Sequence, residues 1–336
     1  MSLRDRLAQW RAQLEPAGDA KGRRRWLSLS VRLVIAALVI AGVGSQFMKL
    51  TERVDWSRIE FSPWELVLSF VLYLCGMTLV AAFFSRVVKD MGGQALRRFG
   101  VVAWWVSQLG KYIPGKAWVV VVRCGLLSTK GVPPAVTTVA SFYETPMMVA
   151  VGAAVACALF AADTKHDLAA KPLLLLMSGA IAVGLGLVLT PWAFAKVAKV
   201  LSLPFGRGGD APPPVRARTV LRGVPTLVAA WLLNGASFVA CVSALSSAPV
   251  PVSDWPLLIA ASGLAVAAGF VVVVMPGGLG VREWVIMSTL SPVLGPELAV
   301  LSAVALRLVW LAVELVASAG SYLSVEASYR RLSRQP

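Results

Sequence analysis

Two short runs place helix-breaking residues, fixed charge and tryptophan inside apolar sequence. The first run is Gly110-Lys-Tyr-Ile-Pro-Gly-Lys-Ala-Trp118, and the second is Pro276-Gly-Gly-Leu-Gly-Val-Arg-Glu-Trp284. An unsatisfied backbone group in hydrocarbon costs several kcal/mol, so a broken helix at membrane depth persists only where protein buries it or where it lines a polar cavity. Two such breaks, one in each half of the chain, predict a substrate site.

The first run has the chemistry of an anion site. Pro114 fixes its own φ and disfavours helix before it, so a new short helix is expected after Gly115. The free N–H groups of such a helix start carry about half a positive charge. Lys111 and Lys116 add full charges on either side, which predicts anion binding. The alternative places both lysines at the membrane interface, in non-specific contact with lipid phosphate.

The second run repeats this chemistry with more glycine. Its breaker residues allow a ligand to approach the backbone closely, and they are Pro276, Gly277, Gly278 and Gly280. The helix expected after them carries Arg282 in its first turn, beside Glu283. The alternative is a lipid-exposed turn whose glycines only pack against neighbouring helices.

Further charged residues lie within apolar segments, where each central charge costs about 2.5–3.5 kcal/mol on insertion scales. Glu144 is expected to pair with Lys111, Lys116, Arg282 or Arg307. Arg123 is expected at the interface, with its charge extended towards the headgroups.

Arg307 and Glu314 share one helix face, with Trp310 between them. A purely structural ion-pair network is the alternative for Glu144, Arg307 and Glu314. The predicted substrate-binding residues are Lys111, Tyr112, Pro114, Gly115, Lys116, Trp118, Glu144, Pro276, Gly277, Gly278, Gly280, Arg282, Glu283, Arg307 and Glu314.

The elements that must position these residues are membrane helices. The chain has 336 residues, 57% of them hydrophobic and 15% charged, which indicates an all-α polytopic membrane protein. Its long apolar segments cover residues 26–48, 62–85, 101–122, 134–161, 171–192, 222–247, 256–275 and 298–324, and a shorter one covers 277–291.

Charge placement predicts how these segments cross. The net charge of +15 lies mostly in the tails and in alternate loops, a positive-inside pattern that argues against nucleic-acid binding. Both termini are therefore expected in the cytoplasm, with the protein in the cytoplasmic membrane. Basic residues flank 101–122 on both sides, whereas both flanks of 256–291 lack lysine and arginine.

Six full spans and two re-entrant hairpins, 101–122 and 256–291, satisfy this pattern. Broken helices that enter from opposite sides predict an inverted repeat around a central site. In the alternative, 101–122 or 256–275 is a full span with a proline kink.

The expected organisation has five parts. Residues 1–25 form a basic amphipathic tail, and 26–327 form the membrane domain. That domain divides into halves of about 26–200 and 222–327, joined by an irregular cytoplasmic linker at 201–221. Residues 328–336 form a basic cytoplasmic tail.

The sequence contains no convincing enzyme motif, no P-loop, no metal-ligand cluster and no cofactor motif. The four cysteines lie in or beside apolar segments without a CxxC pair, and are expected to be small buried hydrophobic residues.

At the two runs, at Glu144 and at Arg307, the chain resembles the membrane region of the lysylphosphatidylglycerol synthase/flippase family (MprF type), over roughly residues 26–325. The resemblance implies movement of an aminoacylated phospholipid between leaflets. It does not extend to the soluble domain that carries the synthase activity, so the resemblance implies the flippase part alone. Relatives often carry Glu-Arg and a nearby Asp where this chain has Glu144-Thr145, and a changed charge count should change the preferred headgroup.

The function expected from the sequence is translocation of a phosphate-bearing lipid, either an aminoacyl-phospholipid or an isoprenoid-phosphate-linked lipid. Two alternatives stay open: a secondary transporter of a small anion, and a non-transporting protein that presents lipid to a glycosyl- or aminoacyl-transferase. The expected partners are membrane lipids with an anionic or aminoacylated headgroup. A separately encoded transferase and a second copy of the chain are further partners left open.

Overall fold

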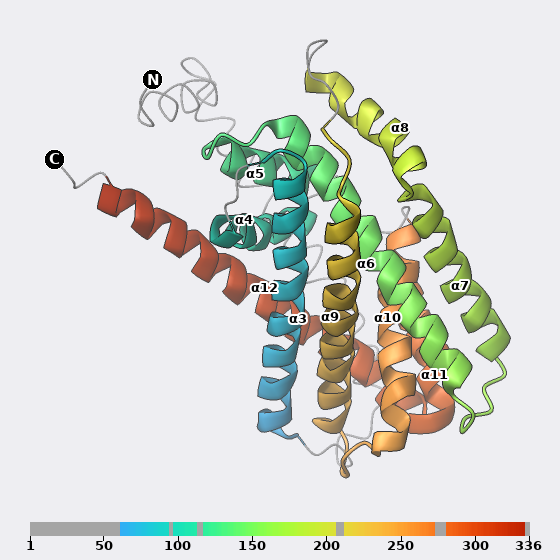
Figure 1. The fold of residues 1–336 in the computed structure, drawn as a ribbon. Helices are drawn as coiled ribbons and strands as arrows, with labels where there is room; N and C mark the ends of the chain where they lie inside the picture. Colours follow the sequence, from blue (N-terminus) through green and yellow to red (C-terminus); the bar gives the residue numbers. More distant parts are fainter. Residues whose placement is uncertain (1–60, 94–96, 113–116, 206–211, 273–279, 333–336) are drawn as a thin grey trace, which may run out of the picture.

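The protein is a bundle of α-helices in the computed structural model, which describes residues 61–93, 97–112, 117–205, 212–272 and 280–332 (Figure 1). No strand occurs among these residues. The predicted tail 1–25 and the apolar segment 26–48 lie outside them, as do Pro114, Gly115, Lys116, Pro276, Gly277 and Gly278.

Long apolar helices form the body of the bundle. They are α3 (Pro63–Asp90), α6 (Pro134–Ala162), α7 (Lys171–Val188), α9 (Ala217–Ser243), α10 (Trp255–Val271) and α12 (Pro296–Leu332). Each of these helices is long and apolar enough to cross a membrane. In the case of α10, the span includes the preceding 3-10 helix η4 (Val252–Asp254). Helices suit this environment because they satisfy their backbone hydrogen bonds internally. The chain is therefore a multi-pass membrane protein.

Helices α3 and α9 form the most extensive helix pair and run antiparallel. The Ser62 N–H donates to the Ala244 carbonyl at 3.0 Å, and at the other end Arg86 donates to the Thr226 hydroxyl at 3.1 Å. The axes approach closely at Gly76, where an added Cβ would lie 2.9 Å from a backbone oxygen of α9. A small residue at this crossing is typical of membrane helix packing.

The first predicted hairpin consists of short helices. Helices α4 (Arg97–Gln108) and α5 (Ala117–Ser128) have 12 residues each, or about 18 Å at the usual rise. Neither length spans a hydrocarbon core of about 30 Å. The two helices pack against each other, with η2 (Leu109–Tyr112) after α4. These lengths fit the predicted re-entrant hairpin.

The second predicted hairpin is uneven. Helix α11 (Val281–Leu294) has 14 residues and packs against α10, so α11 is too short to cross at about 21 Å. The stretch Val252–Val271 has 20 residues and is long enough to cross. The length of α10 therefore fits the alternative prediction of a full span over 256–275. The length of α11 fits the returning half of the predicted hairpin, which does not cross the membrane. The inverted repeat stays a prediction.

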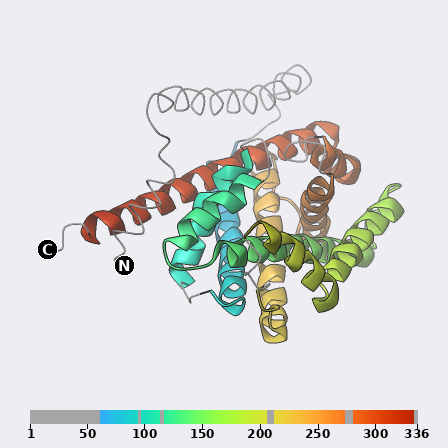
Figure 2. The same cartoon turned by 90° about the horizontal axis from the view of Figure 1, so that it is seen from above.

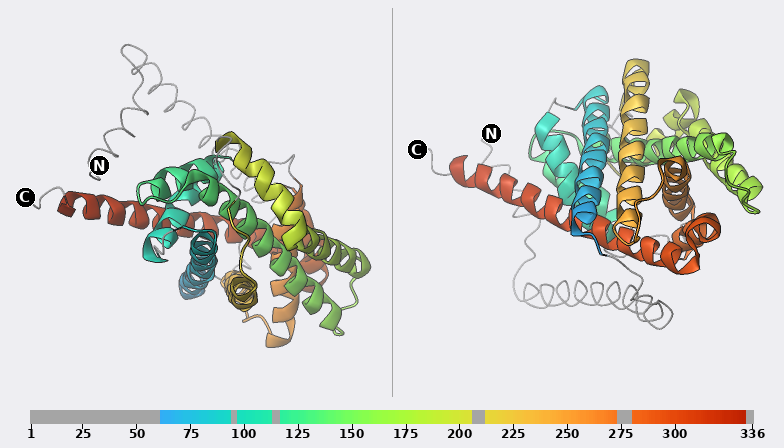
Figure 3. Two further views of the ribbon diagram at one scale, coloured as in Figure 1. Left: turned by 45° about the horizontal axis from the view of Figure 1, so that its top comes forward. Right: turned by 90° about the horizontal axis from the view of Figure 1, so that it is seen from below.

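Helix α12 lies along one side of the bundle and runs obliquely past α9, α3 and α4, with α11 packed near its start (Figures 2 and 3). The connections α6–α7 and α9–α10 lie at one end of the molecule in Figure 1, and the end of α8 and the start of α9 lie at the other. The end of α3 lies near this second end too, because Arg86 of α3 donates to Thr226 of α9. The orientation of the helices in the membrane stays a prediction.

Two expectations from the sequence are wrong in detail. The first residues of the predicted linker at 201–221 belong to the end of α8 (Pro191–Ser202) and to η3 (Leu203–Phe205). The linker expected to be irregular to residue 221 becomes helical at Ala217, because every proline and glycine within the predicted linker precedes that residue. The four cysteines are free, as expected, but Cys75 is exposed on the outer face of α3 instead of buried.

Gly152 offers a test of the packing between α6 and α9. An added Cβ there would lie 2.3 Å from a ring carbon of Trp231, and the Trp231 indole donates to the Met148 carbonyl at 2.8 Å, which limits its movement. Gly152→Ala should lower the free energy of unfolding by about 1–3 kcal/mol through overpacking. Denaturant unfolding of the detergent-solubilised protein measures this change.

The matched control is Gly184→Ala on α7, where an added Cβ would meet nothing within 4 Å. This control should leave stability unchanged or slightly raised, because alanine favours helix over glycine. Equal effects of the two substitutions would contradict the proposed contact.

Candidate functional site

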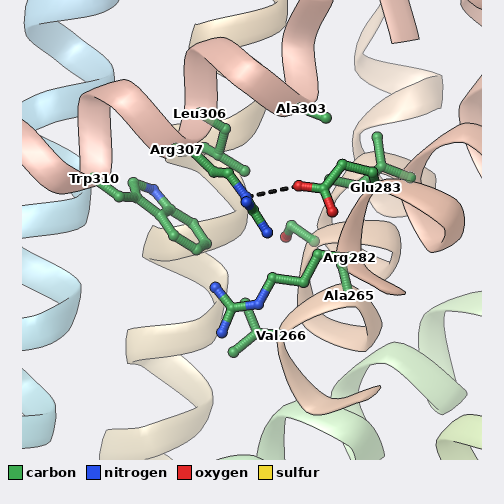
Figure 4. Close-up of a pocket in the computed structure, with 10 residues that line it drawn as sticks. Ala265, Val266, Arg282, Glu283, Ala303, Leu306, Arg307 and Trp310 are labelled. Atoms are coloured by element: carbon green, nitrogen blue, oxygen red, sulfur yellow. Dashed lines mark ion pairs between the residues drawn. The ribbon is translucent and has the colours of Figure 1, made fainter. Parts of the chain in front are cut away.

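The second run forms a charged corner at the start of α11. Gly280 has a φ of +84°, a conformation that glycine adopts without steric cost. Its N–H donates to Glu283 Oε2 at 2.8 Å. The other oxygen of this carboxylate, Oε1, accepts from Arg307 Nε of α12 at 2.8 Å (Figure 4). Both carboxylate oxygens of Glu283 are therefore engaged.

A small cavity lies beside this corner, between α10, α11 and α12. Its volume is about 20 Å³, which is room for about one water molecule. The lining residues are Ser262, Ala265, Val266, Arg282, Glu283, Ile286, Ala303, Leu306, Arg307 and Trp310. Arg282 and Arg307 thus line one cavity, which places two guanidinium groups beside a single carboxylate (Figure 4).

The Arg282 side chain is held at this cavity by α10. An added Cβ at Gly269 would lie 2.8 Å from Arg282 Nε, so the glycine leaves the space that the guanidinium group occupies. The Nε atom is buried and has no hydrogen-bond partner within the described part of the chain. A buried charged donor without an acceptor is costly. This atom is the clearest unsatisfied donor at the cavity.

A second cluster joins the first run to the same helix α12. Lys111 of η2 forms an ion pair with Glu314, and the Tyr73 hydroxyl of α3 donates to the same carboxylate at 2.8 Å. The Glu314 side chain is buried. The Tyr73 ring stacks on Trp310 with 4.5 Å between centroids.

Trp310 connects the two clusters, because its indole lines the cavity and stacks on Tyr73. Arg282 also lies close enough to Tyr73 and Glu314 to interact with them electrostatically. The structure therefore brings Lys111 and Arg282, one from each run, to the same part of α12.

Glu144 belongs to a different cluster. Its Oε2 accepts from Arg123 Nη1 at 3.0 Å, and its Oε1 accepts from the Trp104 indole at 3.3 Å. Arg123 also donates from Nε to the Ser107 hydroxyl at 2.9 Å and lies 4.5 Å from the centre of the Phe84 ring.

Two sequence predictions are corrected by this cluster. The partner of Glu144 is Arg123, whereas Lys111 and Arg307 pair with other carboxylates and Lys116 lies outside the described residues. Arg123 is not at the interface either, since only 2% of it is exposed. The reason is the position of α5, which packs against both α4 and α6. The Arg123 side chain therefore points towards the protein interior.

The other predicted residues are placed as follows. Trp118 is 46% exposed and lies on the outer side of α5. Arg307 and Glu314 share α12 as predicted, but they pair with Glu283 and Lys111, respectively. Of Tyr112 only the backbone is described, in η2. The predicted roles of the breaker residues and of Lys116 stay predictions.

Tyr73 was missed by the sequence analysis. A tyrosine inside an apolar segment is a weak signal for such a role, because a buried hydroxyl needs a hydrogen-bond partner.

Comparison with known proteins agrees with this architecture. No curated protein matches the chain. The model of the family described as the lysylphosphatidylglycerol synthase TM region matches residues 26–318, a range that contains both runs, Glu144 and the charged part of α12. The chain therefore belongs to the lysylphosphatidylglycerol synthase TM region family.

Proposed function

We propose that this protein moves a lipid with a phosphate-bearing headgroup from one membrane leaflet to the other. Membership of the family relates the chain to lipid handling, and the helices make it a multi-pass membrane protein. Two points are proposed beyond these findings: that the lipid carries a phosphate-bearing headgroup, and that the protein moves it between leaflets.

One observation carries the proposal. Arg282 of α11 and Arg307 of α12 line one cavity with Trp310, where Arg282 Nε has no acceptor in the described residues. Lys111 of η2 pairs with Glu314, one helical turn after Trp310. Guanidinium groups suit phosphate because several of their N–H groups can donate to its oxygens together. A phosphate oxygen at the cavity would supply the missing acceptor.

In this proposal, the small cavity is the site in a closed form. A cavity of about 20 Å³ holds about one water molecule, so a headgroup enters only when the helices that line the cavity separate. Those helices are α10, α11 and α12. Alternate opening of a central site towards each leaflet is the transport mode of many proteins with broken membrane helices.

The same proposal includes location and partners. The protein lies in the cytoplasmic membrane with both termini in the cytoplasm, as the loop charges predict. It transports and does not catalyse, and a separately encoded transferase supplies or uses its lipid.

Reconstitution tests the function. Vesicles of phosphatidylcholine containing the protein and a trace of acyl-labelled phosphatidylglycerol should exchange that lipid between leaflets faster than protein-free vesicles, as measured by chemical bleaching of the outer leaflet. Arg282→Gln should slow this exchange by about tenfold, equivalent to about 1.4 kcal/mol of lost stabilisation.

The matched control is Arg218→Gln, which removes the same charge from an exposed position in the first turn of α9. It should exchange lipid at the wild-type rate. Wild-type exchange no faster than in protein-free vesicles would refute the function, and equal rates for the Arg282 variant and wild type would refute the site.

A further inference from the structure

Helix α8 has two different faces. Its inner face consists of Phe194, Ala198 and Ser202, which recur every four residues and are buried. The Phe194 ring meets the Tyr143 ring of α6 edge to face, with 4.8 Å between centroids. The helix has 12 residues, or about 18 Å, and is too short to cross a membrane. One face of α8 is therefore fixed to the bundle, and the other is left for a different contact.

The outer face of α8 combines apolar and cationic side chains. Trp192 is 73% exposed, and Leu203, directly after the helix, is 68% exposed. Lys196 and Lys199 lie between them in the sequence and are exposed as well. Steps of four, three and four residues place all four side chains on one helix face. We call these four residues the α8 surface.

The two lysines of the α8 surface have no carboxylate partner among the described residues. Lys196 Nζ lies 3.7 Å from the centre of the Trp192 ring, a cation–π contact that leaves its charge in place. The sequence supplies no neighbouring acid either, because aspartate and glutamate are absent from residues 168–209. The positive charge of the α8 surface is therefore open to an external anion.

The position of α8 indicates where that anion comes from. Helices α7 and α8 lie along one edge of the bundle (Figures 1 and 2). Of the 18 residues of α7, only Leu174 and Ser178 are buried, so most of this apolar helix is left to face lipid. Helix α8 begins at Pro191, two residues after the C-cap of α7. Tryptophan and lysine next to a lipid-facing helix are typical of the headgroup region.

We propose that the α8 surface binds the headgroups of anionic lipids at the membrane surface. The two ammonium groups attract a lipid with net negative charge, and Trp192 and Leu203 place apolar parts among the acyl chains next to the headgroups. A zwitterionic lipid has the same phosphate group but no net charge, so it binds more weakly. Helix α8 packs against α6 and α7, whereas α10, α11 and α12 line the cavity beside Trp310. The α8 surface is thus separate from the proposed transport site.

Hydrogen exchange in lipid nanodiscs, followed by mass spectrometry, tests the proposal locally. Full-length protein is compared in nanodiscs of phosphatidylcholine and in nanodiscs of equal parts phosphatidylcholine and phosphatidylglycerol. Backbone amides of α8 should exchange at least about fivefold more slowly with phosphatidylglycerol present, because each lysine near an anionic surface stabilises by about that factor.

Three variants identify the side chains responsible. Lys196→Gln combined with Lys199→Gln should abolish the difference between the two lipid compositions, whereas arginine at both positions should retain it. Glutamate at both positions should reverse it, since phosphatidylglycerol would then repel the helix. The control with equal charge loss is Arg216→Gln combined with Arg218→Gln at the exposed start of α9. This control should keep the wild-type difference in α8.

The outcomes decide the proposal. Equal exchange of wild-type α8 in both compositions would overturn it and leave the α8 surface to an acidic protein partner. An effect of the α9 control as large as that of the lysine variant would also overturn it, because general charge would then explain the protection of α8.

Leaflet exchange separates this proposal from the proposed function. In vesicles of phosphatidylcholine with a trace of labelled phosphatidylglycerol, Lys196→Gln combined with Lys199→Gln should exchange lipid at the wild-type rate. Exchange slowed as much as by Arg282→Gln would place α8 on the transport path and overturn the separate surface. A wild-type protein that moves no lipid would refute the proposed function, while protection of α8 by phosphatidylglycerol would still support the α8 surface.

Discussion

Arg123→Ala is expected to lower the free energy of unfolding by about 3–5 kcal/mol, the usual effect of removing one partner from a buried ion pair. The substitution leaves the Glu144 carboxylate inside the bundle without its cation, and it also removes the donor to Ser107. Unfolding of the detergent-solubilised protein, followed by circular dichroism, measures the change.

A double variant separates the ion pair from simple packing. Arg123→Met combined with Glu144→Leu removes both charges and keeps most of the volume, so it should be more stable than either single change. The surface control is Arg98→Ala at an exposed site on α4. A double variant no more stable than the single variants would contradict an electrostatic role for the pair.

Glu314→Ala is expected to destabilise the protein by about 3 kcal/mol, because a buried hydroxyl and a lysine each lose a hydrogen-bond acceptor. Those groups are the Tyr73 hydroxyl and Lys111. The effect should be largest where α12 meets the hairpin α4–α5. Hydrogen exchange followed by mass spectrometry should therefore show faster exchange in η2 and α5.

Two comparisons control for this prediction. Tyr73→Phe removes only the hydroxyl and should cost about 1–3 kcal/mol. Glu297→Ala removes a carboxylate from an exposed position in the first turn of the same helix and should change stability by less than about 1 kcal/mol. If Glu314→Ala is no more destabilising than Glu297→Ala, the contacts of Glu314 do not stabilise the fold.

The membrane helices could be predicted from the sequence because length and apolar content decide them. Residues 134–161 were expected as a span, and α6 covers Pro134–Ala162. Residues 62–85 were likewise expected, and α3 covers Pro63–Asp90. Lipid leaves a segment of this composition little alternative to a helix.

The charge partners could not be predicted in the same way. Whether Arg123 contacts lipid or protein depends on how α5 is rotated against α4 and α6, and rotation is set by tertiary packing. The sequence correctly marked Arg307 and Glu314 as one face of α12, because helical spacing fixes that relation. It contained no comparable rule for their partners Glu283 and Lys111, which lie on other elements.

The separation of ion-pair partners along the chain also decides the order in which the ion pairs can form during synthesis. Arg123 and Glu144 are 21 positions apart, so they can meet soon after α6 enters the membrane. Lys111 and Glu314 are 203 positions apart, and a chain is made from its N-terminus. The carboxylate that receives Lys111 therefore does not exist until 203 further residues have been translated. A hairpin made earlier thus depends on the later helix α12 to complete its contacts.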